Sequence, residues 1–574
     1  MATRNATPKA WHIRPPMPAE VRQSLSRYPD LVARLLYNRS IEDDSQARDF
    51  LSDSPVSHDP FLLPGMQEAV ERISRAVAQG EPTAVYGDFD VDGLSSAALI
   101  TRALGELGVP ITCYIPHRVE EGHGLSLRAV EQLASQGITL LITVDCGISS
   151  HREIQEAADR GIETIVTDHH LPPPEIPPAH AIVDHQLPGS RYPFPSLTGS
   201  GTALKVAQAL YQSIGREMPP GLFSLAALGT IADVAPLVNE NRSIVRLGLD
   251  EMRRAPSVGL RALARSAGLT DGYVDAEDVG WALAPRLNAA GRMDSAMSSY
   301  QLLMADSEEE AATLAQQLER WNRERQQATV GASDRARELL GDEPGPLIMV
   351  DDPSFLPGVI GLVAGRLAGQ FYRPAVVVAT GPEVSRGSCR SIPEFDIGGA
   401  LYRVAAQGIP FLAHGGHRQA AGFTIATERL PELRERLMEV AEEQLSGQEL
   451  EPRREIDEVI PLGSLPPDTY RLIRTLEPFG EGNPTPVFLS RGVQVANVRT
   501  MGSDEQHLRL KLKDKGVTWD AVAFNQGASG QDAKGAVPTP GDGTIDLVYT
   551  VGVDRRRPDG ALRLMVLEFR RSGE

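Results

Sequence analysis

Short apolar runs alternate with longer helix-like stretches between about residues 81 and 235. The runs Thr83–Tyr86, Leu140–Val144 and Thr164–Thr167 are mostly apolar, as expected for strands that are buried on both faces. This alternation predicts an α/β fold with a parallel sheet covered by helices.

The pattern changes at residue 307, where a long polar stretch begins. Ser307 and Glu310 have the spacing of a capping box, so we expect a helix over Glu308–Leu340. Its apolar residues at helical spacing are Leu314, Leu318 and Trp321. A helix with so narrow an apolar stripe is suited to connecting two domains.

Two further patterns follow this helix. Apolar runs at Leu347–Val350 and Ala375–Ala379 predict a second α/β domain. Segments 507–513, 545–551 and 561–569 alternate with period two, which predicts a small β-barrel or sandwich. Because 574 residues exceed what one core can hold, we expect several parts. They are a first α/β domain with an N-terminal extension (1–306), a connecting helix (307–340), a second α/β domain (341–450) and a β-domain (451–574).

The composition is that of a globular protein, with 41% hydrophobic and 23% charged residues. No run reaches the roughly 18 apolar residues of a membrane-spanning helix, and the first residues lack the apolar stretch of a secretory signal. Cys113, Cys146 and Cys389 do not have the spacing of a disulfide framework or a CxxC metal site. We therefore expect a cytoplasmic protein with no membrane partner.

The net charge of −19 is unusual for a protein that binds nucleic acid. Either no nucleic acid is bound, or a local basic channel holds it while acidic residues bind metal ions. The overall charge does not distinguish these two alternatives.

Acidic residues and histidines directly follow the predicted strands, and another aspartate follows a later apolar stretch. In chain order they are Asp88, Asp90 and Asp92, then Asp145, then Asp168-His169-His170, and finally Asp233. The carboxyl ends of parallel strands converge on one crevice. We therefore expect these side chains to form a single cluster.

Such a cluster of like charges repels itself unless cations are bound. Aspartate and histidine without cysteine suit Mn²⁺ or Mg²⁺, and a pair of such ions roughly 3.5–4 Å apart commonly promotes displacement at phosphorus. A single aspartate after a strand is also common as a helix N-cap, and the first motif alone resembles a calcium-loop fragment or a turn. Because all the motifs occur together in strand order, they favour a metal-dependent phosphoesterase with two ions.

These motifs resemble those of the DHH phosphoesterase superfamily, whose name describes Asp168-His169-His170. The resemblance implies that one ion is held by Asp90 and Asp145, with Asp88 close by. It implies that the other ion is held by Asp92, Asp145, His169 and Asp233, so that Asp145 bridges the two. His170 would then face the scissile phosphate, and Asp168 would orient the histidines.

Other segments are similar to the RecJ family of exonucleases within this superfamily. They are Tyr114–Arg118, Gly122–Gly124, Ala284–Arg292, Gly387–Ser391, Gly415–Phe423, Glu477–Gly480 and Gly482–Pro486. The resemblance implies that the three predicted domains are a DHH catalytic domain, a DHHA1 substrate-binding domain and an OB-fold. It implies 5′-to-3′ hydrolysis of single-stranded DNA to 5′-mononucleotides in recombination and repair. It also implies a monomer whose partners include a single-strand-binding protein and a RecQ-type helicase.

The same resemblance implies a set of substrate contacts, which are Arg118, Arg292, Ser388, Arg390 and His417. Arginine suits this role because its guanidinium group binds phosphate through two parallel hydrogen bonds. For Arg286 a surface ion pair is an equally good interpretation. His117, His123 and Phe355-Leu356 stand where the family commonly has Asn, Tyr and Trp-His, which leaves the fine positioning of substrate open.

The predicted β-domain contains a local basic strand. Leu508, Leu510 and Leu512 alternate with Arg509, Lys511 and Lys513, so we expect the cations to form one face. OB-folds bind single strands through a basic groove and stacking aromatic side chains. Arg555–Arg557 add a basic turn, but the nearby aromatic residues are only Trp519 and Phe524. A solvated strand face is the alternative.

Two other functions remain open. A DHH phosphodiesterase of short oligoribonucleotides or cyclic dinucleotides would share the two α/β domains, but it would not need the C-terminal β-domain. A non-catalytic scaffold that binds single strands would lack some metal-binding acids, whereas every expected acid is present here.

Overall fold

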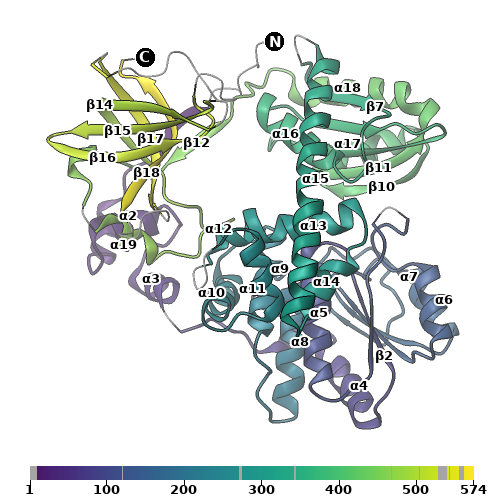
Figure 1. Cartoon of the computed structure of the whole chain (residues 1–574). Helices are drawn as coiled ribbons and strands as arrows, with labels where there is room; N and C mark the ends of the chain where they lie inside the picture. Colours follow the sequence, from purple (N-terminus) through teal and green to yellow (C-terminus); the bar gives the residue numbers. More distant parts are fainter. Residues whose placement is uncertain are drawn as a thin grey trace. The chain divides into compact units, whose positions relative to one another are not determined.

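The computed structural model describes residues 9–573 except 53, 119, 270–273, 342–343, 467, 503–504, 528–539, 542 and 555–560. The chain forms two compact units (Figure 1). We call residues 52–327 with 478–484 the acidic-motif unit, and residues 1–51, 328–477 and 485–574 the terminal unit. The long helix α15 (Glu308–Leu340) begins in the acidic-motif unit and ends in the terminal unit.

The acidic-motif unit is built on a five-stranded parallel sheet in the order β3-β2-β4-β5-β6. Its strands are β2 (Thr83–Gly87), β3 (Ile111–Tyr114), β4 (Leu140–Val144), β5 (Glu163–Thr167) and β6 (Ala181–Val183). Strands β2 and β4 are buried along their whole length, which explains their continuous apolar character. The predicted parallel sheet is confirmed.

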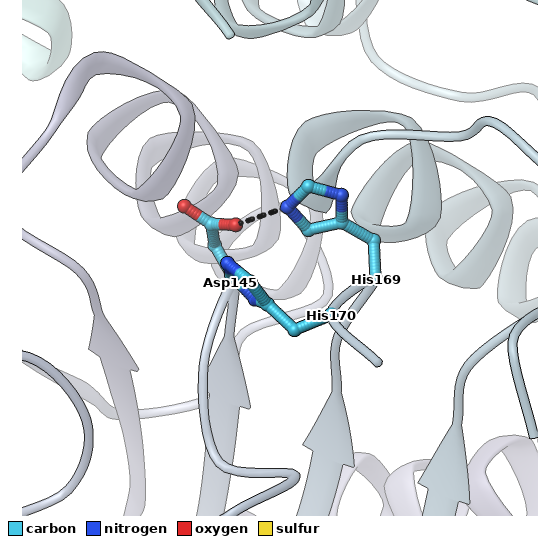
Figure 2. Close-up of side chains that lie close together, drawn as sticks. All are labelled: Asp145, His169 and His170. Carbon is cyan, nitrogen blue, oxygen red and sulfur yellow. Dashed lines mark ion pairs between the residues drawn. The ribbon is translucent and has the colours of Figure 1, made fainter. Parts of the chain in front are cut away.

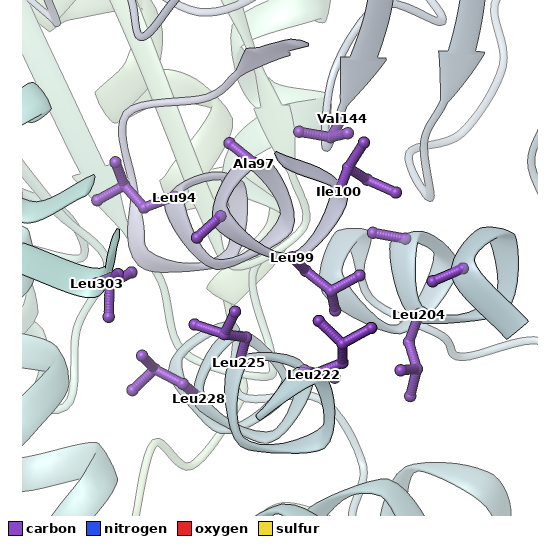
Figure 3. Packing of buried hydrophobic residues seen from close by; sticks show 14 of the residues in the cluster. Leu94, Ala97, Leu99, Ile100, Val144, Leu204, Leu222, Leu225, Leu228 and Leu303 are labelled. Atoms are coloured by element: carbon purple, nitrogen blue, oxygen red, sulfur yellow. The ribbon is translucent and has the colours of Figure 1, made fainter. Parts of the chain in front are cut away.

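Helices cover both faces of this sheet, and further helices pack against those. They are α4 (Met66–Gln79), α5 (Val91–Gly105), α6 (Leu127–Ser135), α7 (His151–Asp159), α8 (Gly199–Ser213), α9 (Leu222–Ala232), α10 (Asn239–Arg254), α11 (Val258–Ser266), α12 (Ala276–Asp278), the π-helical turn η2 (Val279–Leu283), α13 (Ala284–Met293) and α14 (Met297–Met304). Figure 3 shows leucines of α5, α8 and α9 meeting in one core, with Leu99 beside Leu222 and Leu204. Helices α6 and α7 bury the opposite face. These two cores hold the carboxyl ends of the strands in fixed positions.

A short segment from the C-terminal part of the sequence, Pro478–Pro484, belongs to the acidic-motif unit, and we call it the strap. The amide of Leu237 donates a hydrogen bond to the carbonyl of Glu481 over 2.7 Å, and Asn483 is fully buried. A side-chain carbon at Gly480 would lie 2.7 Å from Cδ1 of Leu237, so the buried Leu237 side chain would have to move to admit one. The sequence pattern does not predict this contact.

The terminal unit contains a mixed sheet in the order β10-β11-β9-β8-β7. Its elements are β7 (Ile348–Asp352), α16 (Ile360–Phe371), β8 (Ala375–Ala379), β9 (Val384–Arg390), α17 (Ile397–Ala406), β10 (Phe411–His417), β11 (Ala420–Ala426) and α18 (Leu430–Leu445). Only β7 and β8 are parallel neighbours in this sheet. The second α/β domain is therefore confirmed.

A six-stranded sheet follows in the same unit, and five of its strands, all except β13, close into a barrel. Its strands are β13 (Glu458–Val459), β14 (Phe488–Met501), β15 (His507–Asp514), β16 (Val517–Ala523), β17 (Thr544–Val553) and β18 (Leu562–Arg571), with α19 (Thr469–Arg474) before β14. The sheet closes because β14 pairs with both β15 and β17. The predicted small β-domain is a barrel.

The N-terminal segment packs against this barrel. It contains β1 (Ala10–Ile13), α1 (Ala19–Ser24), α2 (Asp30–Tyr37) and α3 (Asp44–Leu51). Strand β1 pairs in parallel with β12 (Arg453–Ile456), and Asn38 donates a hydrogen bond to the carboxylate of Asp457 over 3.0 Å. Residues up to Leu51 therefore group with the terminal unit, although the sequence pattern suggested an extension of the first α/β domain. Among the described residues, no helix combines the length and the apolar character that a bilayer crossing requires.

Candidate metal centre and substrate contacts

The first acidic motif lies in the turn between β2 and α5. Asp88 and Asp92 are buried, and Asp90 caps the helix by accepting hydrogen bonds from the amides of Asp92 and Gly93. A side-chain carbon at Gly93 would lie 2.6 Å from the amide nitrogen of Asp88, so only glycine permits this turn. The N-cap role and a metal-binding role are compatible for Asp90, because both amides donate to Oδ1 and the cap does not use Oδ2.

The start of α8 holds the carboxylate of Asp92. Its two oxygens accept hydrogen bonds from the amides of Gly199, over 2.7 Å, and Ser200, over 2.9 Å. Gly229 of α9 lies against the same carboxylate, since a side-chain carbon there would be 2.3 Å from Asp92 Oδ1. The sequence analysis did not identify Gly199, Ser200 or Gly229. They lie far from Asp92 in the chain, and the glycines were the only feature that could have indicated them.

Asp145 follows β4 with a backbone φ of 60°, in the left-handed region that non-glycine residues seldom occupy. Its Oδ1 is buried without a hydrogen bond and lies 3.0 Å from Nε2 of His169 (Figure 2). Gly199 also lies against it, because a side-chain carbon there would be 2.5 Å from Cβ of Asp145. Strained backbone of this kind is typical of functional sites.

Asp168 organises the histidine motif after β5. It is buried and accepts hydrogen bonds from the amides of Ile148 and His169 and from Nδ1 of His170, the last over 2.7 Å. This hydrogen bond raises the pKa of His170 to about 9. Burial acts to lower the pKa of His169, but the carboxylates of Asp92 and Asp233 outweigh it and raise the pKa. Asp168 therefore fixes the orientation of His170.

The expected metal-binding side chains come together in three overlapping groups, in each of which the candidate ligand atoms lie within 4.8 Å of one another. The groups are Asp88, Asp90 and Asp145; Asp92, His169 and Asp233; and Asp145, His169 and His170. Asp145 and His169 each belong to two groups. The structure thus brings every sequence-predicted metal ligand to one place.

The electrostatics of this cluster suit divalent cations. Loss of hydration, followed by repulsion from Asp88 and Asp92, raises the pKa of Asp90 to about 6, and the pKa of Asp145 is raised well above its usual value for similar reasons. Oδ1 of Asp88 is buried without a hydrogen-bond partner, and Oδ1 of Asp145 is buried with only the ion pair to His169 beside it. Oxygen ligands with one histidine nitrogen fit Mn²⁺ or Mg²⁺, which would remove the repulsion.

Asp233 ends α9, and the residue after it is strained. Val234 has a φ of 60°, which is a true outlier for a β-branched side chain. The strap lies directly behind this segment, at Pro236 and Leu237. The strap therefore contacts the chain within four residues of Asp233.

Strand β6 adds two buried residues that the sequence did not single out, Asp184 and His185. Loss of hydration raises the pKa of Asp184 to about 7 and lowers the pKa of His185 to about 4. Gln186 donates a hydrogen bond to the carbonyl of His169. Their position after another parallel strand was the available signal, so this strand end supports the histidine motif from behind.

Arg118 and His123, in the loop after β3, contact the first acidic motif. Arg118 is a predicted substrate contact, and His123 departs from the family pattern. The guanidinium group of Arg118 lies 4.6 Å from the ring centre of Phe89, and the ring of His123 lies 4.3 Å from it. Nδ1 of His123 is 3.0 Å from Oδ2 of Asp88. The divergent His123 therefore touches the acidic cluster, whereas Nδ1 of the divergent His117 accepts a hydrogen bond from the amide of Glu120.

Helix α13 packs on the same motif at Gly291, the residue before Arg292, since a side-chain carbon at Gly291 would lie 3.3 Å from the carbonyl oxygen of Phe89. Arg286 forms an ion pair of 2.7 Å with Glu319, and both side chains are mostly buried. Arg286 thus forms an ion pair, as one of its two interpretations expected, but the pair is largely buried and does not lie at the surface.

The other predicted substrate contacts lie in the terminal unit. Ser388 and Arg390 are two residues apart on β9, and Ala420 pairs with both Arg390 and His417, so the three share one face of the sheet. The first turn of α16 packs on them, because a side-chain carbon at Gly361 would lie 2.9 Å from Ser388 Oγ and 3.5 Å from Arg390 Nη2. A hydroxyl, a guanidinium group and a helix start together form an anion-binding arrangement. Phe355 and Leu356, which depart from the family pattern, precede α16 in the chain. The side chain of Phe355 is buried and that of Leu356 is exposed.

On the barrel, Arg509, Lys511 and Lys513 are exposed and their leucine neighbours are buried, as expected. Arg509 pairs across the strands with Arg499, an unfavourable contact that a bound anion would relieve. Trp519 pairs with the buried Leu512 and so lies on the apolar side, which removes it as a stacking candidate beside the cations. Phe524 is exposed, and Arg555–Arg557 lie outside the described residues.

Three segments of the chain match known protein families. Residues 82–230 match the DHH family N-terminal domain, residues 346–443 match the DHHA1 domain and residues 456–568 match the RecJ OB domain. The fold and the acidic cluster therefore define a protein of the DHH superfamily. Each match falls within one of the expected domains, whose exact boundaries stay predictions.

Comparison with individual proteins narrows this class. The single-stranded-DNA-specific exonuclease RecJ of Bacillus subtilis (strain 168) is 38% identical over 87% of this chain, but the match spans only 63% of that protein. RecJ of Escherichia coli (strain K12) is 32% identical over 94% of this chain and 95% of that protein. The crystal structure of RecJ in complex with Mn²⁺ from Thermus thermophilus is 30% identical with a TM-score of 0.82, covering 98% of this chain and 80% of that one. The chain belongs to the RecJ family.

Proposed function

We propose that this protein is a metal-dependent exonuclease that hydrolyses single-stranded DNA from the 5′ end to 5′-mononucleotides. The observation that carries this proposal is the cluster of strand-end carboxylates and histidines in a chain of the RecJ family. A role in recombination and repair, a monomeric state, a cytoplasmic location, and contacts with a single-strand-binding protein and a RecQ-type helicase belong to the same proposal.

Two divalent ions, Mn²⁺ or Mg²⁺, would be held by the residues of the overlapping groups. One would lie among Asp88, Asp90 and Asp145, and the other among Asp92, Asp145, His169 and Asp233. Ions bound there would lower the pKa of water and stabilise negative charge on the phosphodiester oxygens. RecJ of Thermus thermophilus has been crystallised with each of these metals.

The protein's own groups orient the substrate. His170 is held by Asp168, has a pKa near 9 and keeps its side chain about half exposed, so it can donate a hydrogen bond to a phosphate. Phosphate groups of the strand would contact Arg118 and Arg292 in the acidic-motif unit, and Ser388, Arg390 and His417 in the terminal unit. The basic face of Arg509, Lys511 and Lys513 would hold more distant phosphates, which explains how an acidic chain can bind DNA.

The direct test uses single-stranded DNA labelled at either end, with Mn²⁺ or with EDTA, and an Asp145→Asn variant. We expect mononucleotides from the 5′ end, with loss of the reaction in EDTA and in the variant. Cleavage of di- to pentaribonucleotides with DNA left intact would favour the oligoribonuclease instead. Binding of DNA without any cleavage would favour the scaffold.

A further inference from the structure

Three of the most exposed large apolar side chains of the described chain lie beside the acidic motifs. Trp281 is 82% exposed, Val234 is 66% exposed and Leu171 is 65% exposed. Leu171 directly follows His170, and Val234 directly follows Asp233. Exposed apolar side chains that gather at a polar site usually mark a surface that binds something.

Trp281 belongs to a helical segment that passes from one acidic motif to another. At one end, a side-chain carbon at Gly280 would lie 3.7 Å from Ile231, two residues before Asp233. At the other end, a side-chain carbon at Gly291 would lie 3.3 Å from the carbonyl of Phe89, in the first motif. The segment η2–α13 therefore packs on α9 just before Asp233 at one end and on the first acidic motif at the other.

Trp281 lies at one end of this segment, next to Gly280, which contacts α9 two residues before Asp233. Arg292 lies at the other end, directly after Gly291, which contacts the turn of the first motif. The segment therefore carries an aromatic residue near one acidic motif and an arginine near another.

Helical geometry explains why Trp281 is exposed. Val279 and Leu283 are almost fully buried, so Trp281, midway between them, points away from the core. The five residues form a π-helical turn, a feature that is common at functional sites. An indole ring that is 82% exposed contributes little to the core and is available to a ligand.

A nucleobase is the occupant that these neighbours favour. Bases stack on aromatic side chains with little dependence on sequence, because every base has an apolar face. A protein partner over this rim would cover the cluster at which the strand must be cut. Arg292, at the other end of the same segment, carries a positive charge, as is usual where single strands bind.

Resting on the proposed function, we propose that Trp281 stacks on a nucleobase of the bound single strand, and that Leu171 and Val234 extend this apolar rim beside the metal centre. The strand is then recognised through its bases as well as its phosphates at the site of hydrolysis. Removal of the aromatic ring weakens binding of strands that carry bases and leaves abasic strands unaffected.

The experiment measures binding of end-labelled thymidine oligonucleotides by fluorescence anisotropy in EDTA, so that no cleavage occurs. The strands carry one tetrahydrofuran abasic residue at successive positions, or none. The proteins are the full-length wild type, Trp281→Ala, Trp281→Phe and a control, Ile214→Ala, which alters an exposed apolar residue at the end of α8. Thermal unfolding checks that each variant is folded.

We expect Trp281→Ala to weaken binding of the intact strand about tenfold, while Trp281→Phe and Ile214→Ala bind nearly as the wild type. One abasic position should weaken wild-type binding by a similar factor and cause no further loss in Trp281→Ala. Wild-type affinity in Trp281→Ala, or an equal loss on intact and fully abasic strands, would overturn the proposal. If the wild type neither binds nor cuts single-stranded DNA, the proposed function fails and this proposal fails with it.

Discussion

Gly199 leaves no room for a side chain beside Asp145, so Gly199→Ala tests whether the start of α8 sets the metal centre. The new carbon would lie 2.5 Å from Cβ and 2.6 Å from Oδ1 of Asp145. Ordinary carbon–carbon contacts are about 3.5–4.0 Å, so one of the two backbones must move by about 1 Å. The amide of Gly199 also holds Asp92, and the movement therefore disturbs both proposed ion sites.

The expected effect opposes intrinsic helix propensity. An alanine in a helix is favoured over glycine by roughly 0.5–1 kcal/mol, so without the clash the variant should be slightly more stable. With the clash, we expect Mn²⁺ affinity to fall about 10–100-fold, as is typical when a residue that orients a ligand is lost. A misplacement of about 1 Å should also lower the nuclease rate about 100-fold, which corresponds to about 2.7 kcal/mol.

Mn²⁺ binding is measured by electron paramagnetic resonance and stability by urea unfolding in EDTA. Gly201→Ala is the matched control, because it lies in the same helical turn and its new carbon would approach only Leu197 and Thr198 side chains, at 3.3 and 3.5 Å. Full Mn²⁺ affinity in Gly199→Ala, together with stability equal to that of the control, would refute the reasoning.

Three further predictions concern the acidic cluster, the strap and the barrel. Asp90→Asn keeps a good N-cap but removes a carboxylate whose pKa is raised to about 6. In EDTA at pH 7 the Tm of this variant should be a few degrees above that of the wild type. The increase in Tm that Mn²⁺ causes in the wild type should be absent in the variant. Because the folded pKa exceeds the unfolded one, this group costs the metal-free wild type stability as pH rises from about 4 to 6, and equal pH profiles of the two proteins would contradict this. Gly480→Ala should lose about 1–3 kcal/mol in urea unfolding through the clash with Leu237, whereas Gly552→Ala, with 3.7 Å of clearance, should not. Neutralising substitutions at Arg509, Lys511 and Lys513 should reduce the slope of log K against log salt concentration for DNA binding by about 2. An unchanged slope would exclude these three residues as phosphate contacts.

The sequence alone determined the local chemistry of this protein. Buried parallel strands need continuous apolar runs, and the acids stand immediately after those runs, so Asp88, Asp145 and Asp168 could be assigned to one edge of the sheet. The alternation of Leu508 with Arg509 likewise specified which side of β15 faces solvent. These inferences depend on neighbours in the chain, where periodicity reports geometry directly.

Only the tertiary structure decided which distant segments complete the site. Gly199 and Gly229 lie far from Asp92 and Asp145 in sequence, yet each is needed because no side chain fits beside those carboxylates. The strap reaches Leu237 from the C-terminal part of the chain, and Trp519 was assigned to the apolar side of the barrel only once its partner across the strands was known. Close approach and strand register are properties of packing between segments, and no local pattern of hydrophobic and polar residues encodes them.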